Sequence, residues 1–111
     1  MREVIAVPTQ LRIYTINRGR LDDFVAAWQR GIYPLRQRLG FRIDGAWAIR
    51  DRNEFVWILS LEGTEEEWRA RDAAYYASPE RVALDPDPAQ WIAQVNQWFV
   101  EPVLPIARRD S

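Results

Sequence analysis

The chain has 111 residues, 48% of them hydrophobic, and its 15 basic side chains almost balance its 16 acidic ones. This length predicts a single domain over residues 1–111 with one hydrophobic core. The sequence contains no His, no Cys and no Lys. These absences exclude a Cys nucleophile, a His base, a Lys Schiff base and a Cys/His zinc site. The balanced charge argues against a nucleic-acid partner.

The first part of the chain predicts a strand followed by a long helix. Residues 11–17 alternate and carry β-branched and aromatic side chains, which is typical of a strand. The spacing of the next apolar residues predicts a helix over 21–39 that ends at Gly40. Pro34 removes one backbone hydrogen bond inside this helix, so we expect a kink after Gly31. The apolar stripe of the helix consists of Leu21, Phe24, Val25, Trp28, Ile32, Leu35 and Leu39.

The middle of the chain predicts a hairpin and a second helix. Residues 41–50 and 54–62 read as two strands joined by a short polar turn. Thr64 and Glu67 then form a capping box, which predicts a helix that runs to about Ala77. This helix has two candidate buried stripes, and the sequence leaves open which one faces the sheet. The two stripes are Ala70, Ala73, Ala74 and Ala77, and the aromatic pair Trp68 and Tyr75.

The last part of the chain predicts a loop over residues 79–88, which is rich in proline turns, and a final strand over about 94–104. Pro102 and Pro105 make the end of that strand an edge, and we expect residues 106–111 to be a frayed tail. No stretch is long and apolar enough for a membrane helix or a signal peptide. We therefore expect a cytoplasmic protein with no membrane partner.

The predicted element order is typical of the α+β class and its ferredoxin-like βαββαβ protomer, an antiparallel four-stranded sheet with helices on one face. If the other face met water, it should be polar. Val56 and Ile58 instead lie opposite the larger apolar side chains of their strand. We therefore expect a homodimer that packs sheet against sheet. In the preceding strand, the side chains predicted to share one face are Phe41, Ile43, Gly45, Trp47 and Ile49.

The order and spacing of several packing residues from about residue 10 to the second helix resemble the NIPSNAP-like family of the dimeric α+β barrel superfamily. This resemblance implies a ferredoxin-like protomer whose sheet pairs with that of its twin to form a barrel. It also implies a cavity between each sheet and its helices, where members of the superfamily bind small molecules. The matching residues are Tyr14, Thr15, Ile16, Gly19, Leu21, Phe24, Trp28, Pro34, Leu35, Gly40, Phe41, Gly45 and Trp47.

The absence of His separates this chain from part of that superfamily. Haem-degrading and cyclase relatives typically use a His, so their mechanism does not transfer. Quinone-forming monooxygenase relatives work without a metal or a cofactor and hold an oxidisable phenol with Tyr, Trp, Asn and Arg, which this chain has. The resemblance therefore implies no cofactor and no metal, and the NIPSNAP-like family itself has no settled activity to carry over.

Two residues are candidates for proton chemistry. Tyr14 matches the tyrosine of the family and, by alternation, shares a face with Arg12. Its hydroxyl would donate to a substrate oxygen, or it would be satisfied by a polar neighbour. Asp44 lies in mid-strand, on the predicted face of Arg42 and Ala46. If buried, its carboxylate would have a raised pKa and act as a base, while an ion pair with an arginine is the alternative.

The candidate substrate-binding residues are aromatic or lie beside aromatic residues. Trp47 and Trp57 would line a cavity, or fill the core or the dimer interface. Asp72 shares a helical edge with Trp68, where it would pair with Arg69 or anchor the mouth of a cavity. The full set of candidates is Arg12, Trp28, Trp47, Trp57, Trp68, Asp72 and Tyr75.

These observations leave two hypotheses for function. The first is a metal-free and cofactor-independent enzyme, of monooxygenase, cyclase or isomerase type, that acts on a small apolar or aromatic metabolite in a cavity lined by Trp and Tyr. The second is a non-catalytic dimeric module that binds a metabolite or a protein, in which the Trp residues serve packing. A cavity with convergent polar side chains would favour the first hypothesis.

Overall fold

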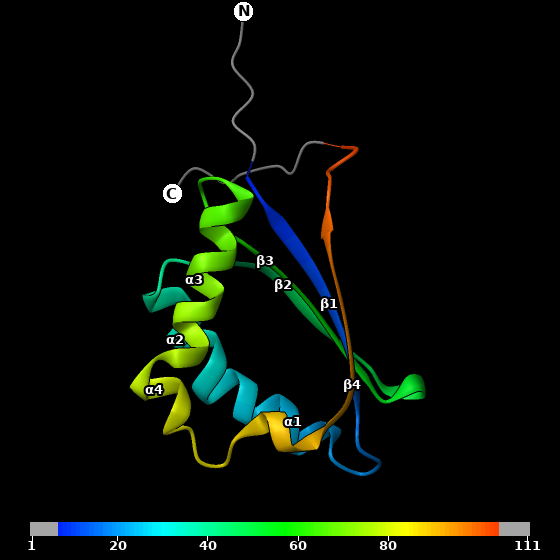
Figure 1. Cartoon of the computed structure of the whole chain (residues 1–111). Helices are drawn as coiled ribbons and strands as arrows, with labels where there is room; N and C mark the ends of the chain where they lie inside the picture. The colour runs from blue at the N-terminus through cyan, green and yellow to red at the C-terminus, as the bar shows by residue number, and fades with distance from the viewer. Residues whose placement is uncertain (1–6, 105–111) are drawn as a thin grey trace, which may run out of the picture.

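The computed structural model describes residues 7–104, and its elements follow the predicted order (Figure 1). The strands are β1 Thr9–Ile16, β2 Arg42–Ile49, β3 Glu54–Ser60 and β4 Ile92–Val100. The α-helices are α1 Leu21–Ala27, α2 Tyr33–Arg38, α3 Glu65–Ala77 and α4 Pro79–Val82. Short segments of other helical types are η1 Trp28–Ile32, η2 Arg50–Arg52 and η3 Pro88–Trp91.

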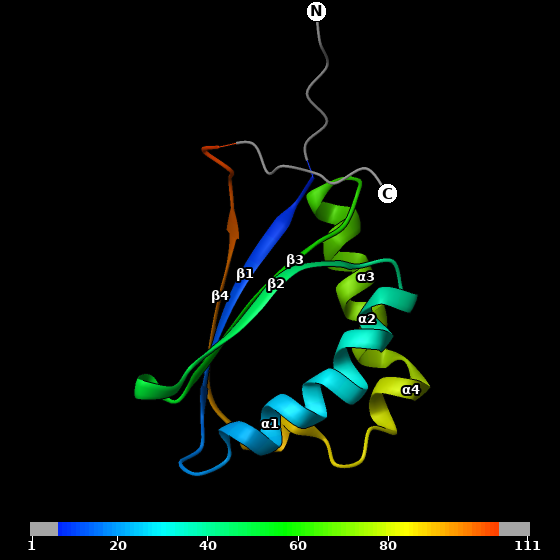
Figure 2. The same ribbon diagram turned by 180° about the vertical axis from the view of Figure 1, so that it is seen from behind.

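The four strands form one antiparallel sheet in the order β2-β3-β1-β4. Within the described part of the chain, the α-helices lie on one face of this sheet and none covers the other face (Figures 1 and 2). This arrangement confirms the predicted ferredoxin-like α+β fold. We call the uncovered side of the sheet the open face. No helix within residues 7–104 is long and apolar enough to cross a membrane.

The predicted helix over 21–39 is present, with a change of geometry in its middle. The five residues of η1 form a π-helical turn, in which the backbone N–H of Tyr33 donates to the carbonyl oxygen of Trp28. Such a bulge allows Pro34, which has no N–H, to follow in the first turn of α2. The ribbon changes direction between α1 and α2, as expected (Figure 2). Gly40 then ends the helix with a φ of 94°.

A β-bulge in β2 changes which of its side chains face the helices. Ile43 pairs with Leu59, but the next pair is Gly45 with Ile58, so Asp44 is an extra residue. The bulge reverses the alternation, so that Ile43 packs against the core while Trp47 lies on the open face, 53% exposed. The prediction that the apolar residues of this strand share a single face is therefore wrong.

The structure shows which of the two predicted stripes of α3 is buried. Trp68 and Tyr75 are buried, each 1% exposed, whereas the stripe of four alanines is exposed to solvent. The predicted capping box is present, because Thr64 Oγ1 accepts from the Glu67 N–H and Glu67 Oε1 accepts from the Thr64 N–H, both at 3.0 Å. The aromatic edge therefore points at the sheet.

The C-terminal part departs from the prediction in two respects. The predicted loop contains α4, which begins at the Ser78 cap, and leads to η3. Strand β4 begins and ends earlier than the predicted range of 94–104, because it pairs with β1 and that pairing ends where Val100 meets Thr9. The predicted frayed tail, 106–111, lies outside the described residues.

The open face of the sheet carries a set of large apolar side chains. By their pairing, Leu11, Val56 and Ile58 point to this face and are only partly exposed. Trp47 and Trp98, on the two edge strands, are about half exposed. The sequence prediction of an apolar second face is confirmed for this protomer.

Candidate functional site

A cavity of about 160 Å³ lies between the sheet and the helices, where the resemblance placed one. Four aromatic residues line it, Tyr14 and Trp57 from the sheet and Tyr75 and Tyr76 from α3. Its polar lining residues are Arg36, Arg81 and Gln97. Its aliphatic lining residues are Ile32, Ala89, Ile92 and Val95. The cavity thus combines an apolar wall with a few polar groups, which is typical of a small-molecule site.

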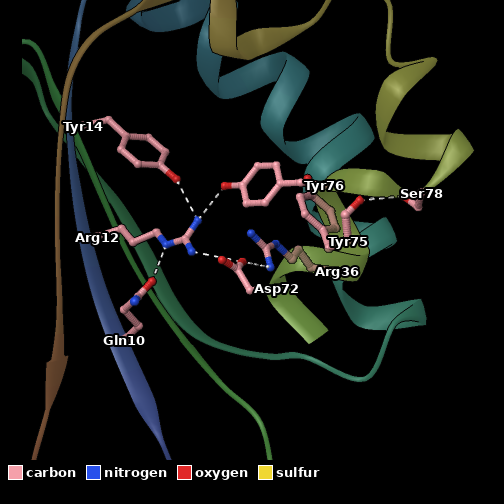
Figure 3. Close-up of polar contacts among 8 residues, drawn as sticks. All are labelled: Gln10, Arg12, Tyr14, Arg36, Asp72, Tyr75, Tyr76 and Ser78. Carbon is pink, nitrogen blue, oxygen red and sulfur yellow. Dashed lines mark hydrogen bonds and ion pairs between the residues drawn. The ribbon is translucent and has the colours of Figure 1, made fainter. Parts of the chain in front are cut away.

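The Arg12 side chain connects the walls of this cavity (Figure 3). Strand alternation places it on the helix-covered face between Gln10 and Tyr14. Its Nε donates to Gln10 Oε1 at 2.7 Å, and its Nη1 donates to the hydroxyl of Tyr76 at 2.9 Å and of Tyr14 at 3.4 Å. Its Nη2 donates to Asp72 Oδ1 at 3.1 Å. One guanidinium therefore fixes groups from both the sheet and α3.

The surroundings of Arg12 keep it charged and rigid. Its guanidinium carbon lies 5.6 Å from the ring centroid of Trp57 and 5.7 Å from that of Trp68, which is cation–π distance. The side chain is 1% exposed. Although burial alone would lower the pKa of Arg12, the nearby tyrosine hydroxyls and the Asp72 carboxylate raise it above its ordinary value. Arg12 thus acts as a fixed positive charge.

Arg36 is a second buried arginine of the site, and it shares the carboxylate of Asp72. Its Nη1 donates to Asp72 Oδ1 at 2.8 Å, so one carboxylate oxygen accepts from both Arg12 and Arg36. Its guanidinium carbon lies 3.6 Å from the ring centroid of Tyr75. The sequence left open a pair between Asp72 and Arg69, and the structure does not have it. Asp72 pairs with the two buried arginines instead, and Arg69 pairs with the exposed Glu65.

Tyr14 and Tyr75 remain protonated at neutral pH because their pKa values are raised. Burial raises the pKa of Tyr14, although Arg12 opposes this effect. Burial likewise raises the pKa of Tyr75 to about 12. The oxygens of Tyr14 and Tyr76 accept from Arg12, which leaves both hydroxyl hydrogens free to donate. These tyrosines therefore suit the stabilisation of an electron-rich ligand oxygen rather than the removal of a proton.

The structure brings five of the predicted site residues to the cavity. Tyr14, Trp57 and Tyr75 line it, while Arg12 and Asp72 lie behind this lining and hold it through hydrogen bonds. Two other predicted residues lie in the core. Trp28 stacks on Tyr33 and contacts Phe55, and Trp68 packs edge-on against Phe41 and Phe99.

The structure does not bring Asp44 or Trp47 to the cavity. The bulge in β2 places Asp44 beside Ser60, whose hydroxyl donates to Asp44 Oδ2 at 2.9 Å. Arg42 Nε lies 3.1 Å from Asp44 Oδ1, so Asp44 has the ion pair that the sequence left as an alternative to a catalytic role. The expected placement of Asp44 on the face of Ala46 is wrong, because Ala46 packs against the core. Trp47 lies on the open face.

Sequence reasoning missed several cavity residues. Arg36 continues the buried row of Trp28 and Ile32 at a spacing of four, so a charged residue on an apolar stripe was the available signal. Tyr76 adjoins the predicted cavity mouth at Asp72 but is not among the predicted site residues. Arg81 lies on a short helix that was predicted to be a loop, and nothing in its local sequence points to the cavity. Its Nη1 lies 3.2 Å from Asp87 Oδ1.

No group of three or more Asp or Glu side chains within residues 7–104 is arranged to hold a metal ion. Among the described residues, no carboxylate lines the cavity. The chemistry of the site therefore rests on tyrosine hydroxyls, guanidinium groups and aromatic rings.

Comparison with known proteins identifies the fold. No family model matches the sequence, and no curated protein matches it. Among solved structures, a NIPSNAP family protein from Agrobacterium tumefaciens has a TM-score of 0.80 at 12% identity, with 93% of this chain and 91% of that chain covered. A NIPSNAP-like domain protein from Burkholderia xenovorans has a TM-score of 0.74 at 24% identity, with 92% and 91% covered.

The comparisons also reach named monooxygenase-like proteins. A putative antibiotic biosynthesis monooxygenase from Bacteroides thetaiotaomicron has a TM-score of 0.70 at 17% identity, with 94% of this chain and 96% of that chain covered. The chain therefore has the ferredoxin-like α+β fold that these two groups of proteins share. Within that class, its fold is that of NIPSNAP family proteins, as the sequence resemblance implied.

Proposed function

We propose that this protein binds a small aromatic molecule in the cavity between its sheet and its helices, and acts on it without a metal or a cofactor. One observation carries the proposal. The cavity joins aromatic walls to convergent donors, because the hydroxyls of Tyr14 and Tyr76 are both oriented by Arg12. The similar fold of the putative antibiotic biosynthesis monooxygenase from Bacteroides thetaiotaomicron supports the same type of function.

The chemistry that suits these donors is one in which negative charge develops on a substrate oxygen. A phenol or enol that passes its proton to water places charge on that oxygen, and preoriented hydroxyl and guanidinium groups stabilise such charge. Oxygenation of a phenol by dioxygen, which yields a quinone and water, passes through the phenolate, and a cyclisation or isomerisation that proceeds through an enolate passes through a similar anion. The site supplies this stabilisation, and the raised pKa values of Tyr14 and Tyr75 keep both residues protonated for it.

A fluorescence titration followed by a turnover assay tests the proposal. Trp57 lines the cavity, so binding of a phenol or a hydroxyquinone should change the Trp emission. Tyr14→Phe should lower the affinity or the rate by about tenfold, as expected for the loss of one buried hydrogen bond. Tyr33→Phe is the matched control, because the hydroxyl of Tyr33 bonds only to Gln37 on an exposed surface.

The outcomes separate the two functional hypotheses. Binding with no turnover of any panel compound would favour a non-catalytic binding module. Absence of binding by every aromatic compound would contradict the proposal. Asp44→Asn tests the sequence-based assignment of Asp44 as a base, and full turnover by this variant would remove Asp44 from the mechanism.

We further propose that the open face packs against the open face of a second copy. The support is the row of large apolar side chains there, among them Trp47 and Trp98, which are 53% and 51% exposed. Exposed apolar surface of this kind is unfavourable in water and typical of an interface. A second copy offers the same surface, as an isologous contact requires.

A further inference from the structure

The cavity has more buried positive charge around it than negative charge. Three guanidinium groups adjoin it, those of Arg12, Arg36 and Arg81. Within residues 7–104 their ion-pair partners are two carboxylates, because Asp72 pairs with both Arg12 and Arg36 while Asp87 pairs with Arg81. Three positive charges against two negative charges leave an excess of one. Arg12 and Arg36 are each 1% exposed, so water screens little of this excess.

Several donors around the cavity also have no acceptor. Arg36 Nε, Arg81 Nε and the hydroxyl of Tyr75 are buried and have no hydrogen-bond partner within the described chain. All three residues line the cavity. Buried polar groups are normally paired, so three unpaired donors in residues that line one cavity require an explanation. All three atoms are closed to water in this structure, so an acceptor in the cavity would reach them only after a shift of the lining side chains. The lining supplies no carboxylate that would fill this role.

The two arginines that line the cavity both lie beside the tyrosine rings of α3. The guanidinium carbons of Arg36 and Arg81 lie 5.4 Å and 5.8 Å from the ring centroid of Tyr76. Both also lie near the ring of Tyr75, at 3.6 Å and 5.9 Å. Ile92 and Val95 of β4 and Trp57 of β3 line the side formed by the sheet. The two lining guanidinium groups thus come from the helix layer, whereas the sheet contributes these apolar side chains together with the polar side chains of Tyr14 and Gln97.

The volume of the cavity limits the size of its ligand. A cavity of about 150 Å³ accommodates a benzene ring, and this cavity measures about 160 Å³. One aromatic ring with one small substituent therefore matches the space, whereas a fused polycyclic molecule requires the cavity to open.

We propose that the ligand of this cavity is an aromatic monoanion with a single ring, a carboxylate or a phenolate, whose negative group lies against Arg36 and Arg81. This inference rests on the proposed function and specifies the class of its substrate. In the proposed complex the ring packs against Trp57 and the aliphatic side chains of β4, and a shift of the lining side chains brings the otherwise unpartnered donors to the anion. Its single charge matches the excess of one positive charge around the cavity.

Calorimetric titration of the full chain with matched probes tests this inference. Benzoate and benzamide have nearly the same shape and differ in charge, while acetate has the charge without the ring. We expect benzoate to bind about tenfold more tightly than benzamide and than acetate. A second arm compares 4-nitrophenolate with neutral phenol and shows whether the preferred anion is a carboxylate or a phenolate.

Single substitutions test which residues cause the preference for an anionic ligand. Arg81→Met and Tyr75→Phe should each reduce benzoate affinity about tenfold and leave benzamide affinity almost unchanged. Arg36→Met should have the same effect, and the other two variants carry the test if this fully buried position does not fold. Arg38→Met is the matched control, because Arg38 is exposed two residues further along the same helix. It should bind benzoate as the unchanged chain does.

Each result has a separate meaning. Equal affinity for benzoate and benzamide, or tighter binding of benzamide, would overturn the inference but leave the proposed function standing. Equal binding of acetate and benzoate would also overturn it, because the ring would then contribute nothing. If none of these probes and no neutral aromatic compound binds, the proposed function itself fails.

Discussion

Arg12 in β1 and Tyr76 in α3 are 64 residues apart in the sequence, yet Arg12 Nη1 donates to the Tyr76 hydroxyl at 2.9 Å. This bond joins the sheet to the helix layer directly beside the cavity (Figure 3). Because the arginine uses the phenol oxygen as an acceptor, the phenol hydrogen remains available. A contact that stabilises the fold thus also orients a donor of the candidate site.

Asp72→Asn should be strongly destabilising. The carboxylate is 18% exposed and is the ion-pair partner of both Arg12 and Arg36, so its removal leaves two buried positive charges side by side. Removing one partner of a buried ion pair costs about 3 kcal/mol. Urea denaturation followed by circular dichroism measures the free energy of unfolding. Glu65→Gln is the control, because its pair with Arg69 is exposed and should contribute less than about 1 kcal/mol. Equal losses in the two variants would contradict the buried-charge interpretation.

Part of this site could be predicted because it follows from local periodicity. The period of two in a strand places Arg12 and Tyr14 on the same face, and the period of 3.6 in a helix places Trp68 and Tyr75 on one edge. The capping box of Thr64 and Glu67 is likewise a local pattern, and the structure has it. These features depend only on residues a few positions apart.

The remaining features depend on contacts between distant segments, which one sequence does not specify. The bulge at Asp44 arises from the register of β2 against β3, and a shift of one residue exchanges the faces of every later side chain. Asp72 has an arginine close by in its own helix, so the local sequence favours that partner over two arginines from other elements. Arg81 reaches the cavity only because α4 folds back towards α3.

Tyr75 should contribute to a loss of stability at alkaline pH. Its pKa is raised to about 12 in the folded state from an ordinary value of 10.0. Between these values the folded state retains a proton that the unfolded state has lost, so the free energy of unfolding falls as pH rises, by up to about 1.4 kcal/mol per pH unit. Below about pH 10 this contribution is constant. Denaturation measured from pH 8 to about pH 12 should therefore show a shallower decline for Tyr75→Phe, with Tyr33→Phe as the exposed control.

The cap of α3 should support both the helix and the site on it. Thr64→Ala removes the side-chain acceptor for the Glu67 N–H and should lower the free energy of unfolding by about 1 kcal/mol. Thr64→Ser keeps the hydroxyl and should lose only a few tenths of a kcal/mol. Thermal denaturation of the two variants under the same conditions compares them directly. An equal loss in both would assign the effect to the lost methyl group instead of the cap.

If the open face is the dimer interface, the chain should form a dimer in solution, and that dimer should depend on Trp47 and Trp98. Trp47 and Trp98 lie on opposite edge strands, so packing of two sheets would bury both, and an aspartate at either position would place an unpaired charge in the interface. We expect sedimentation equilibrium at micromolar concentration to give a dimer for the unchanged chain and a monomer for the double variant Trp47→Asp and Trp98→Asp. Val82→Asp, at an exposed position of α4 on the helix side, should remain dimeric. A monomeric unchanged chain would refute the proposed interface. An unchanged dimer in the double variant would show that a different surface mediates association.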